Sequence, residues 1–292
     1  MKLTDLAKSG KPLLTAEIFP PKGTNLARVL AKAKLLSPAI AAFNITDSQR
    51  AVMRLSALAI SKVLRDAGYL PIYQLTCRDR NRIALQSDLL GAAALGIENV
   101  LLLSGDHPKH GDHPEAKPVF DLDAAHLLDV ARGLMAGKDM QGNALDGRPD
   151  FCLGAVVNPT AEPMEHQLFM LRKKVMLGAE YFQTQVIYDV AVYRQFLAGV
   201  AALKLPAMPL VLPSVLLLKS AKMAERMAQV PGIRIPESVV ARMQGAADPL
   251  AEGQKICAEL IDELLGLAPG AHIMAINCEE LIPDILARCK KL

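Results

Sequence analysis

The stretch Glu98-Asn-Val-Leu-Leu-Leu-Ser-Gly-Asp-His-Pro108 decides the fold that this sequence predicts. Its apolar run does not alternate with polar residues, which indicates a strand buried on both faces, as in a parallel sheet. Gly105 and Pro108 then end the strand and begin a loop. Asp106 is therefore expected at the carboxyl end of a buried strand, where α/β barrels and open α/β sheets carry their chemistry. A structural aspartate in a turn would give the same local pattern.

The rest of the chain repeats this unit of a strand followed by a helix. Further strands are expected at residues 13–19, 40–46, 70–76, 151–157, 179–187, 208–212 and 271–276. Helices are expected at residues 25–36, 50–67, 80–95, 121–135, 163–177, 188–203, 219–229, 237–243, 249–265 and 279–290. An open doubly wound sheet shows the same alternation, but eight units at a spacing of roughly 30 residues favour closure. We therefore predict a single-domain (β/α)8 TIM barrel over residues 1–292.

Composition narrows the class of protein. Of the 292 residues, 51% are hydrophobic but only 4% are aromatic, so the core must be aliphatic. A formal charge of +3, well mixed along the chain, argues against a nucleic-acid partner. Five scattered cysteines favour reduced thiols and a cytoplasmic location. The amino terminus does not resemble a signal peptide, and prolines interrupt the apolar run 205–218, so no membrane span is expected.

Polar residues at the strand ends should converge on one mouth of the barrel. These residues are Glu17, Thr46, Thr76, Asp106, Asn158, Gln185 and Asn277. Carboxylates, hydroxyls and amides in this mixture suit a polar ring system better than a phosphate or a metal. His107, His110, His113 and Asp112 could bind a metal, but a solvated loop is favoured, and no metal site is predicted. The sequence also lacks the glycine motifs of Rossmann and P-loop nucleotide sites.

Glu17 and the pair Gln183 and Gln185 are the least expected residues of the buried strands. Glu17 lies within an apolar run, where burial would raise its pKa and suit it to act as a general acid. An ion pair with a lysine or arginine at a strand end is the alternative. Gln183 and Gln185 are expected to be buried on one face of a strand, where their amides would match the amide edge of a pterin or flavin. A structural hydrogen-bond network is the alternative.

Several motifs in one order resemble methylenetetrahydrofolate reductase, an FAD-containing barrel enzyme of one-carbon metabolism. They are Ala16-Glu-Ile-Phe-Pro-Pro21, Leu75-Thr-Cys77, Leu103-Ser-Gly-Asp-His-Pro108, Arg172-Lys-Lys-Val-Met-Leu-Gly-Ala179 and Phe182-Gln-Thr-Gln185 followed by Asp189. The resemblance extends from about residue 13 to residue 276. It implies the short bacterial form, which lacks the regulatory domain of the longer enzymes.

The resemblance also implies roles for individual residues. Glu17 matches the general acid that opens the five-membered ring of 5,10-methylenetetrahydrofolate. Asp106 matches the acid near the flavin and the pterin, and Gln185, with Gln183 beside it, matches the substrate-binding position. Residues implied to hold FAD are Thr46, Gln74, Ser104, Gly105, Asp106, Phe120, Asn158 and Lys174. The implied enzyme is a cytoplasmic homo-oligomer of methionine biosynthesis that takes electrons from NADH or NADPH.

The sequence departs from the better-known members at a few of these positions. Ser104 stands in place of an arginine, and Gln74 in place of a histidine that contacts the flavin. The segment Leu216-Leu-Leu-Lys-Ser220 replaces one that brings an aromatic residue to the folate or nicotinamide. This pattern is similar to reductases of anaerobic pathways, some of which depend on a partner subunit. An accessory subunit and a flavin-free, pterin-dependent methyltransferase therefore stay open as alternatives.

Overall fold

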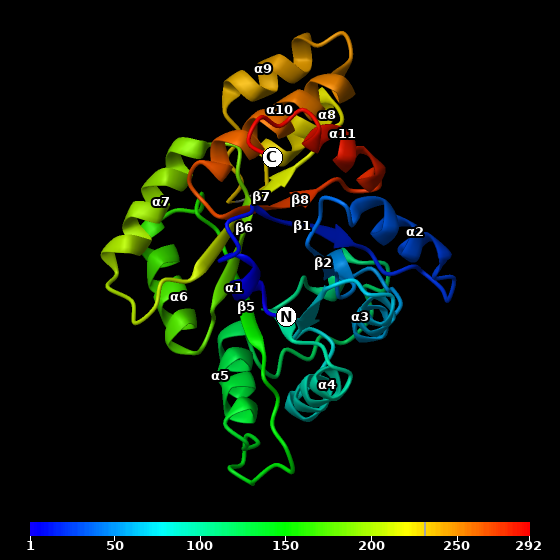
Figure 1. Ribbon diagram of the computed structural model, residues 1–292, viewed down its shortest axis with the longest axis vertical. Coiled ribbons are helices and arrows are strands. Elements are labelled where there is room, and N and C mark those ends of the chain that lie inside the picture. Colours follow the sequence, from blue (N-terminus) through cyan, green and yellow to red (C-terminus); the bar gives the residue numbers. More distant parts are fainter. Residues whose placement is uncertain (231) are drawn as a thin grey trace.

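Eight parallel strands form a closed barrel at the centre of the molecule (Figure 1). The computed structural model describes residues 1–230 and 232–292. The strands follow one another around the barrel in chain order, and the last pairs with the first. They are β1 (Leu13–Ile18), β2 (Ala42–Ile45), β3 (Pro71–Thr76), β4 (Asn99–Leu103), β5 (Cys152–Val157), β6 (Tyr181–Val186), β7 (Leu210–Leu216) and β8 (Gly270–Met274). The predicted (β/α)8 barrel is confirmed.

Helices surround the barrel (Figure 1). They are α1 (Leu3–Leu6), α2 (Ala27–Leu36), α3 (Ala57–Asp66), α4 (Arg82–Ala94), α5 (Ala124–Met135), α6 (Met164–Met176), α7 (Val190–Ala202), α8 (Ala221–Ala228), α9 (Glu237–Gly245), α10 (Pro249–Leu265) and α11 (Ile282–Leu286). Short 3₁₀ turns are η1 (Gln49–Ala51), η2 (Pro108–His110) and η3 (Glu279–Leu281). Within the two described ranges, none of the helices has the length and apolar character needed to cross a bilayer.

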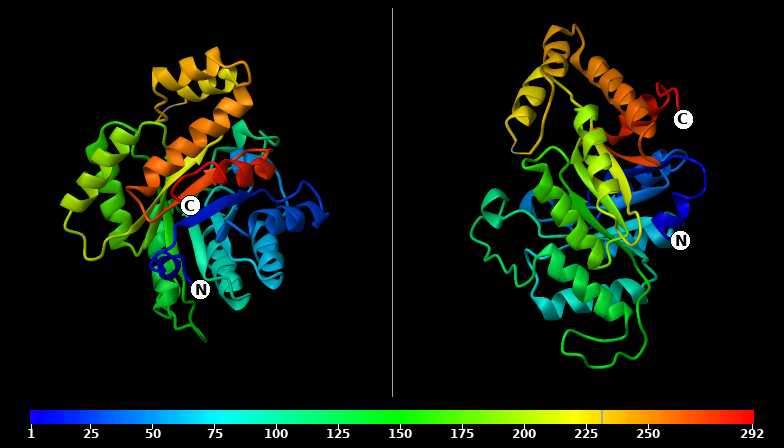
Figure 2. Two further views of the ribbon diagram at one scale, coloured as in Figure 1. Left: turned by 45° about the horizontal axis from the view of Figure 1, so that its top comes forward. Right: turned by 90° about the vertical axis from the view of Figure 1, so that its left-hand side faces the viewer.

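The amino-terminal end of the barrel is closed by apolar side chains and by α1, which the sequence did not reveal. Leu3 of α1 is fully buried, and its N–H donates to Oδ1 of Asn99 at 2.9 Å. It packs on the lowest inward layer of the barrel, which consists of Leu13, Ala42, Ile72, Leu101, Cys152, Tyr181 and Leu212. The right-hand view of Figure 2 shows the amino terminus on one side of the barrel and the segment after β4 on the other. The carboxyl ends of the strands therefore form the opposite mouth.

A polar layer lies above this apolar floor. By the alternation of side chains along each strand, it contains Thr15, Asn44, Gln74, Gln183, Ser214 and His272, all of which are buried. Nδ1 of His272 lies 2.9 Å from Oγ1 of Thr15 and 3.4 Å from Nδ2 of Asn44. Burial lowers the pKa of His272 to about 3, so its ring is neutral. Barrel layers are usually aliphatic, so polar side chains here extend the mouth downward into the barrel.

Three predicted boundaries need correction. Pro213 lies inside β7, whereas the sequence predicts that it ends this strand. It coincides with an irregularity in the pairing of β6 with β7, between Gln183 and Val186, where a residue without an N–H is tolerated. The helix predicted over 279–290 is replaced by η3 and the short α11, which ends at Leu286.

The third boundary concerns the segment between β2 and α3. The predicted helix over 50–67 begins only at α3, where the Ser56 hydroxyl caps the first turn by accepting the N–H of Ala59. The preceding residues Ser48, Arg50 and Ala51 all have positive φ, which is costly for residues other than glycine. The apolar spacing that predicts a longer helix therefore belongs in part to a tightly wound loop at the mouth.

A glycine follows each of the helices α4 and α6 before the next strand begins. Gly96 follows α4 with a φ of 75°, and Gly178 follows α6 with a φ of 105°. Each glycine ends its helix in the left-handed region, where a side chain would be strained. The chain then enters β4 and β6 directly, which brings their carboxyl ends to the mouth.

Candidate active site

Glu17 lies on the inward face of β1, directly above the polar layer. Its side chain is 7% exposed, and Oε2 has no hydrogen-bond partner among the described residues. Burial, with a smaller contribution from the negative charge of Glu279, raises the pKa of Glu17 to about 7. The alternative of an ion pair is wrong, since no cation of the described chain pairs with it. The carboxyl can therefore hold and release a proton near neutral pH.

Glu279 is a second buried carboxyl that the sequence analysis missed. It lies in η3, just after β8, and is 1% exposed. Oε2 accepts a hydrogen bond from Nζ of Lys32 in α2 at 2.6 Å, and Oε1 has no partner among the described residues. The available signal was an acid shortly after the last strand, but the sequence analysis assigned Glu279 to the start of a helix.

Two further polar atoms face the mouth without a partner in the described chain. They are Oγ1 of Thr46, at the end of β2, and Nε2 of Gln183, in β6. Gln185 differs from its prediction, because it is exposed and its Oε1 accepts the N–H of Val186 at 3.0 Å. The expected burial of both glutamines is thus correct only for Gln183. A buried polar atom without a partner costs about 1–3 kcal/mol, which a polar ligand could offset.

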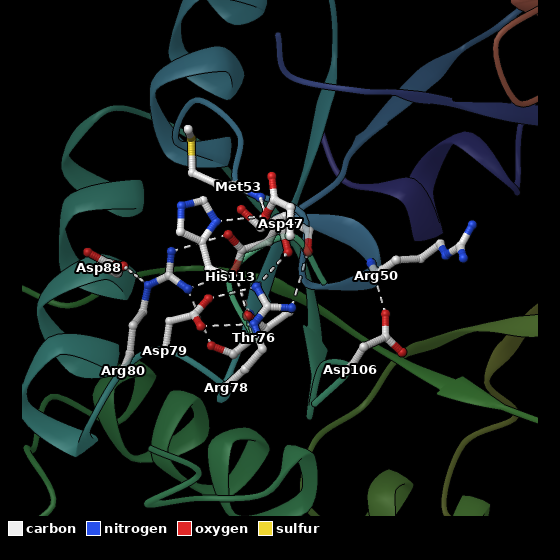
Figure 3. A network of polar contacts seen from close by, with 12 residues as sticks. Asp47, Arg50, Met53, Thr76, Arg78, Asp79, Arg80, Asp88, Asp106 and His113 are labelled. Atoms are coloured by element: carbon white, nitrogen blue, oxygen red, sulfur yellow. Dashed lines mark hydrogen bonds and ion pairs between the residues drawn. The ribbon is translucent and has the colours of Figure 1, made fainter. Parts of the chain in front are cut away.

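Asp106 lies in the loop between β4 and α5, beyond Gly105, which has a φ of 89°. The Asp106 side chain is exposed, and its Oδ2 accepts the N–H of Arg50 at 2.9 Å (Figure 3). A Cβ added at Gly105 would lie 3.0 Å from Cβ of Thr76, so glycine is favoured by space as well as by conformation. Asp106 thus joins two loops of the mouth and keeps its other carboxylate oxygen available.

Asp47 organises the neighbouring part of the mouth, and the sequence analysis did not single it out. The residue is 5% exposed. Its Oδ2 accepts the N–H of Thr76 at 2.9 Å, the Thr76 hydroxyl at 2.8 Å and Nη1 of Arg80 at 2.7 Å (Figure 3). Arg80 also donates to Asp88 at 2.7 Å, and these carboxylates raise its pKa despite its burial. Thr76 lies at the mouth as predicted, and both its N–H and its hydroxyl donate to Asp47.

The loop between β4 and α5 is largely exposed, as the sequence suggests, and polar contacts fix it to its neighbours. Asp112 pairs with Lys22 and His113, and its Oδ1 accepts the N–H of Met53 at 2.9 Å. These contacts hold the loop against the segments after β1 and β2. Within the described residues, no group of three or more potential metal ligands occurs.

The other predicted cofactor residues divide between the inside and the rim of the barrel. Gln74 is 8% exposed, and its Nε2 donates to Oδ1 of Asn44 at 3.5 Å in the polar layer. Ser104 is exposed, and its hydroxyl accepts the N–H of Ala124 at the start of α5. Phe120 has a φ of 39°, and its ring stacks with that of His107 at 6.2 Å between centroids. These contacts set Ser104 and Phe120 in the rim, apart from Gln74.

The remaining two residues belong to the side of β5. Oδ1 of Asn158 accepts the N–H of Thr160 at 3.2 Å. Lys174, in α6, donates from Nζ to the carbonyl of Val156 at 2.7 Å, and burial lowers its pKa. The Val156 side chain is 37% exposed at the penultimate position of its strand, which gives this side an apolar surface. The structure therefore brings Glu17, Thr46, Gln74 and Gln183 together, with the other predicted residues around them.

Comparison with known proteins agrees with this geometry. The methylenetetrahydrofolate reductase family model matches residues 2–290. Methylenetetrahydrofolate reductase 2 of Schizosaccharomyces pombe is 25% identical over 321 residues, a match that covers 98% of this chain and 47% of that protein. The 5,10-methylenetetrahydrofolate reductase of Pectobacterium carotovorum subsp. carotovorum is 23% identical over 241 residues, covering 81% of this chain and 74% of that protein. The chain spans about half the length of the yeast relative.

Among solved structures, an uncharacterized protein from Clostridium thermocellum has the same fold. The TM-score is 0.67 at 16% identity, with 97% of this chain and 96% of that one covered. That protein is described as binding two copies of 5-methyl-5,6,7,8-tetrahydrofolic acid. Because the family model matches nearly the whole chain, this chain belongs to the methylenetetrahydrofolate reductase family.

Proposed function

We propose that this chain catalyses the flavin-dependent interconversion of 5,10-methylenetetrahydrofolate and 5-methyltetrahydrofolate. The observation that carries the proposal is Glu17, a buried carboxyl whose pKa of about 7 lets it exchange a proton at neutral pH. Opening the five-membered ring of the folate requires such a proton, and the barrel mouth is where this fold keeps its catalytic groups. The names of the relatives and the folate bound by the Clostridium thermocellum protein support this choice of substrate.

The chemistry of the mouth fits a flavin beside a pterin. Both rings have edges of amide-like donors and acceptors. The unpartnered atoms of Glu17, Thr46 and Gln183 offer complementary groups. We assign the contacts with FAD to Thr46, Gln74, Ser104, Gly105, Asp106, Phe120, Asn158 and Lys174. A flavin held by these residues would supply hydride chemistry beside the pterin.

The residues of the chain then have distinct tasks. Glu17 gives its proton to a ring nitrogen of the folate as the bond to the methylene carbon opens. Gln183 and Gln185 hold the amide edge of the pterin. The free oxygen of Asp106 places negative charge near the cation that develops, which stabilises the opened ring. In the reverse direction, Glu17 takes the proton back.

The variant Glu17→Gln tests the proposal directly. Purified protein should bind FAD and be yellow, and reduced flavin should be reoxidised by methylenetetrahydrofolate. Glu17→Gln should slow that folate half-reaction by about 10²–10⁴-fold, the usual contribution of a general acid. Anaerobic stopped-flow absorbance measures this rate, and flavin reduction by NADH or NADPH is the internal control.

Two results would contradict the proposal in different ways. Equal loss of both half-reactions would exclude an acid role confined to the folate step. Colourless protein that neither binds FAD nor converts the folate would exclude a flavin-dependent reductase and favour a flavin-free methyltransferase.

A second candidate is a subunit that receives electrons from a partner protein. The segment after β7 favours it, because Leu216, Leu217 and Leu218 are all buried and offer no aromatic surface for a nicotinamide. Nζ of Lys219 already donates to the carbonyl of Ile276 at 2.9 Å. This candidate predicts stable co-purification with a partner and no NADH or NADPH oxidation by the isolated chain. Full activity of the chain alone would exclude it.

A further inference from the structure

Two buried carboxyls approach the same part of the mouth from different elements. Glu17 enters from β1, and Glu279 enters from η3, which follows β8, the neighbour of β1 in the barrel. Each has one oxygen that is buried and unpartnered among the described residues. The negative charge of Glu279 therefore adds to burial in disfavouring the ionised form of Glu17.

Lys32 distinguishes the two carboxyls, because it pairs with one of them. Its ammonium group donates to Oε2 of Glu279 at 2.6 Å and touches only this member of the pair. Glu279 is therefore held in a buried ion pair. Glu17 has no such cation, and the negative charge of Glu279 acts with burial to favour its protonated form.

We propose that Glu279, paired with Lys32, is a positioning residue that keeps Glu17 protonated for its role as the acid. The inference rests on the proposed function, since it assigns the origin of the proton that opens the folate ring. Glu279 acts through Glu17, and its own contact with the ligand is not required. The raised pKa of Glu17, to which the charge of Glu279 contributes after burial, agrees with this arrangement.

The other charged groups around Glu17 do not replace Glu279 in this role. Below Glu17, from β8, His272 is neutral because burial lowers its pKa to about 3. From the loop after β2, the carboxylate of Asp47 is paired with Arg80. From the loop after β7, Lys219 donates to a backbone carbonyl. Lys32 and Glu279 are thus the charged pair that sets the balance at Glu17.

The test is a direct titration of the Glu17 carboxyl by infrared difference spectroscopy, with Glu17→Gln protein as the reference. The wild type should titrate near pH 7. Glu279→Gln should lower the midpoint by about one unit, the smaller end of the effect of a neighbouring charge. Glu279→Asp keeps the charge and should titrate close to the wild type. The pH at which the folate half-reaction slows should shift in parallel.

Lys32→Met should shift the titration midpoint in the direction opposite to Glu279→Gln, and it leaves both carboxyls in place. Without the cation, the pair should release its last proton at higher pH. Glu280→Gln is the matched control, since this exposed neighbour should leave the titration unchanged. An unchanged midpoint in Glu279→Gln, or equal shifts in Glu279→Gln and Lys32→Met, would overturn the inference. Wild-type protein without folate turnover would overturn the proposed function instead, and the infrared shifts would still decide the proton's location.

Discussion

The substitution Asp47→Ala should cost more stability than any other loss of a single carboxylate at the mouth. Asp47 is buried at the end of β2 and accepts from the backbone and hydroxyl of Thr76 and from Arg80. Alanine removes all of these acceptors at once. It also leaves the Thr76 N–H and hydroxyl without their partner in a site that is 3% exposed.

The magnitude follows from these contacts. Removing one member of a buried ion pair costs about 3–5 kcal/mol, because the other charge stays buried. Arg80 is 19% exposed and keeps its 2.7 Å contact with Asp88, so its charge is not left alone. The Thr76 donors add about 1–3 kcal/mol of unsatisfied polar burial. We expect a total loss of about 3 kcal/mol in the free energy of unfolding, a large share of the usual 5–15 kcal/mol.

Urea unfolding, followed by circular dichroism, measures this difference at constant m-value. Asp66→Ala is the matched control, because it also removes an aspartate from an ion pair, in this case the exposed pair with Lys62 in α3. That loss should stay at or below about 0.5 kcal/mol. A loss of less than about 1 kcal/mol for Asp47→Ala would refute the view that this network holds the loop after β2.

Two further predictions concern Glu17 and Gly154. The pKa of Glu17 is 4.5 in the unfolded chain and about 7 in the folded protein. Between these pH values the folded protein keeps a proton that the unfolded chain has released. The free energy of unfolding therefore falls as the pH rises through this window and is constant above it. Relative to Glu17→Gln, the wild type should lose about 3 kcal/mol in the free energy of unfolding between these two pH values, as measured in urea. If the difference between the two proteins did not change with pH, the raised pKa would be contradicted. Gly154→Ala should destabilise by about 1–3 kcal/mol, because the new Cβ would lie 2.1 Å from Cζ of buried Tyr181. Gly245→Ala, which meets no atom within 4 Å, is its control in thermal unfolding.

Most of the fold could be predicted because local pattern and global packing agree. The run Val100-Leu-Leu-Leu103 is buried as a strand except at its last residue, and Gly105 turns the chain with a positive φ. The departures occur where tertiary context overrides a local rule. Pro213 normally ends a strand, but the irregular pairing between β6 and β7 accommodates it. The strained loop that contains Arg50 is held by Asp106, a contact across 56 positions that local spacing does not reveal.

The site could be predicted only in part, for a related reason. Glu17 was found because a charge inside an apolar run is visible in the sequence alone. Glu279 and Asp47 were missed because their partners, Lys32 and Arg80, are distant in sequence and meet them only when the barrel closes. Gln185 shares the period of Gln183, yet it lies one layer higher and is exposed. Periodicity predicts the face of a strand, but depth in the barrel depends on the stagger of neighbouring strands.

The polar layer lies deep in the barrel, immediately below most of the residues that are proposed to bind the folate. Aliphatic residues could have formed the layer of Thr15, Asn44 and His272, as in most barrels, without leaving a buried polar group unsatisfied. Gln183, in the same layer, and Glu17 and Thr46, directly above it, each keep a buried atom unpartnered among the described residues. Each such atom costs about 1–3 kcal/mol in the free protein. A polar heterocycle would offset this cost on binding, whereas a purely structural network would already have satisfied these atoms.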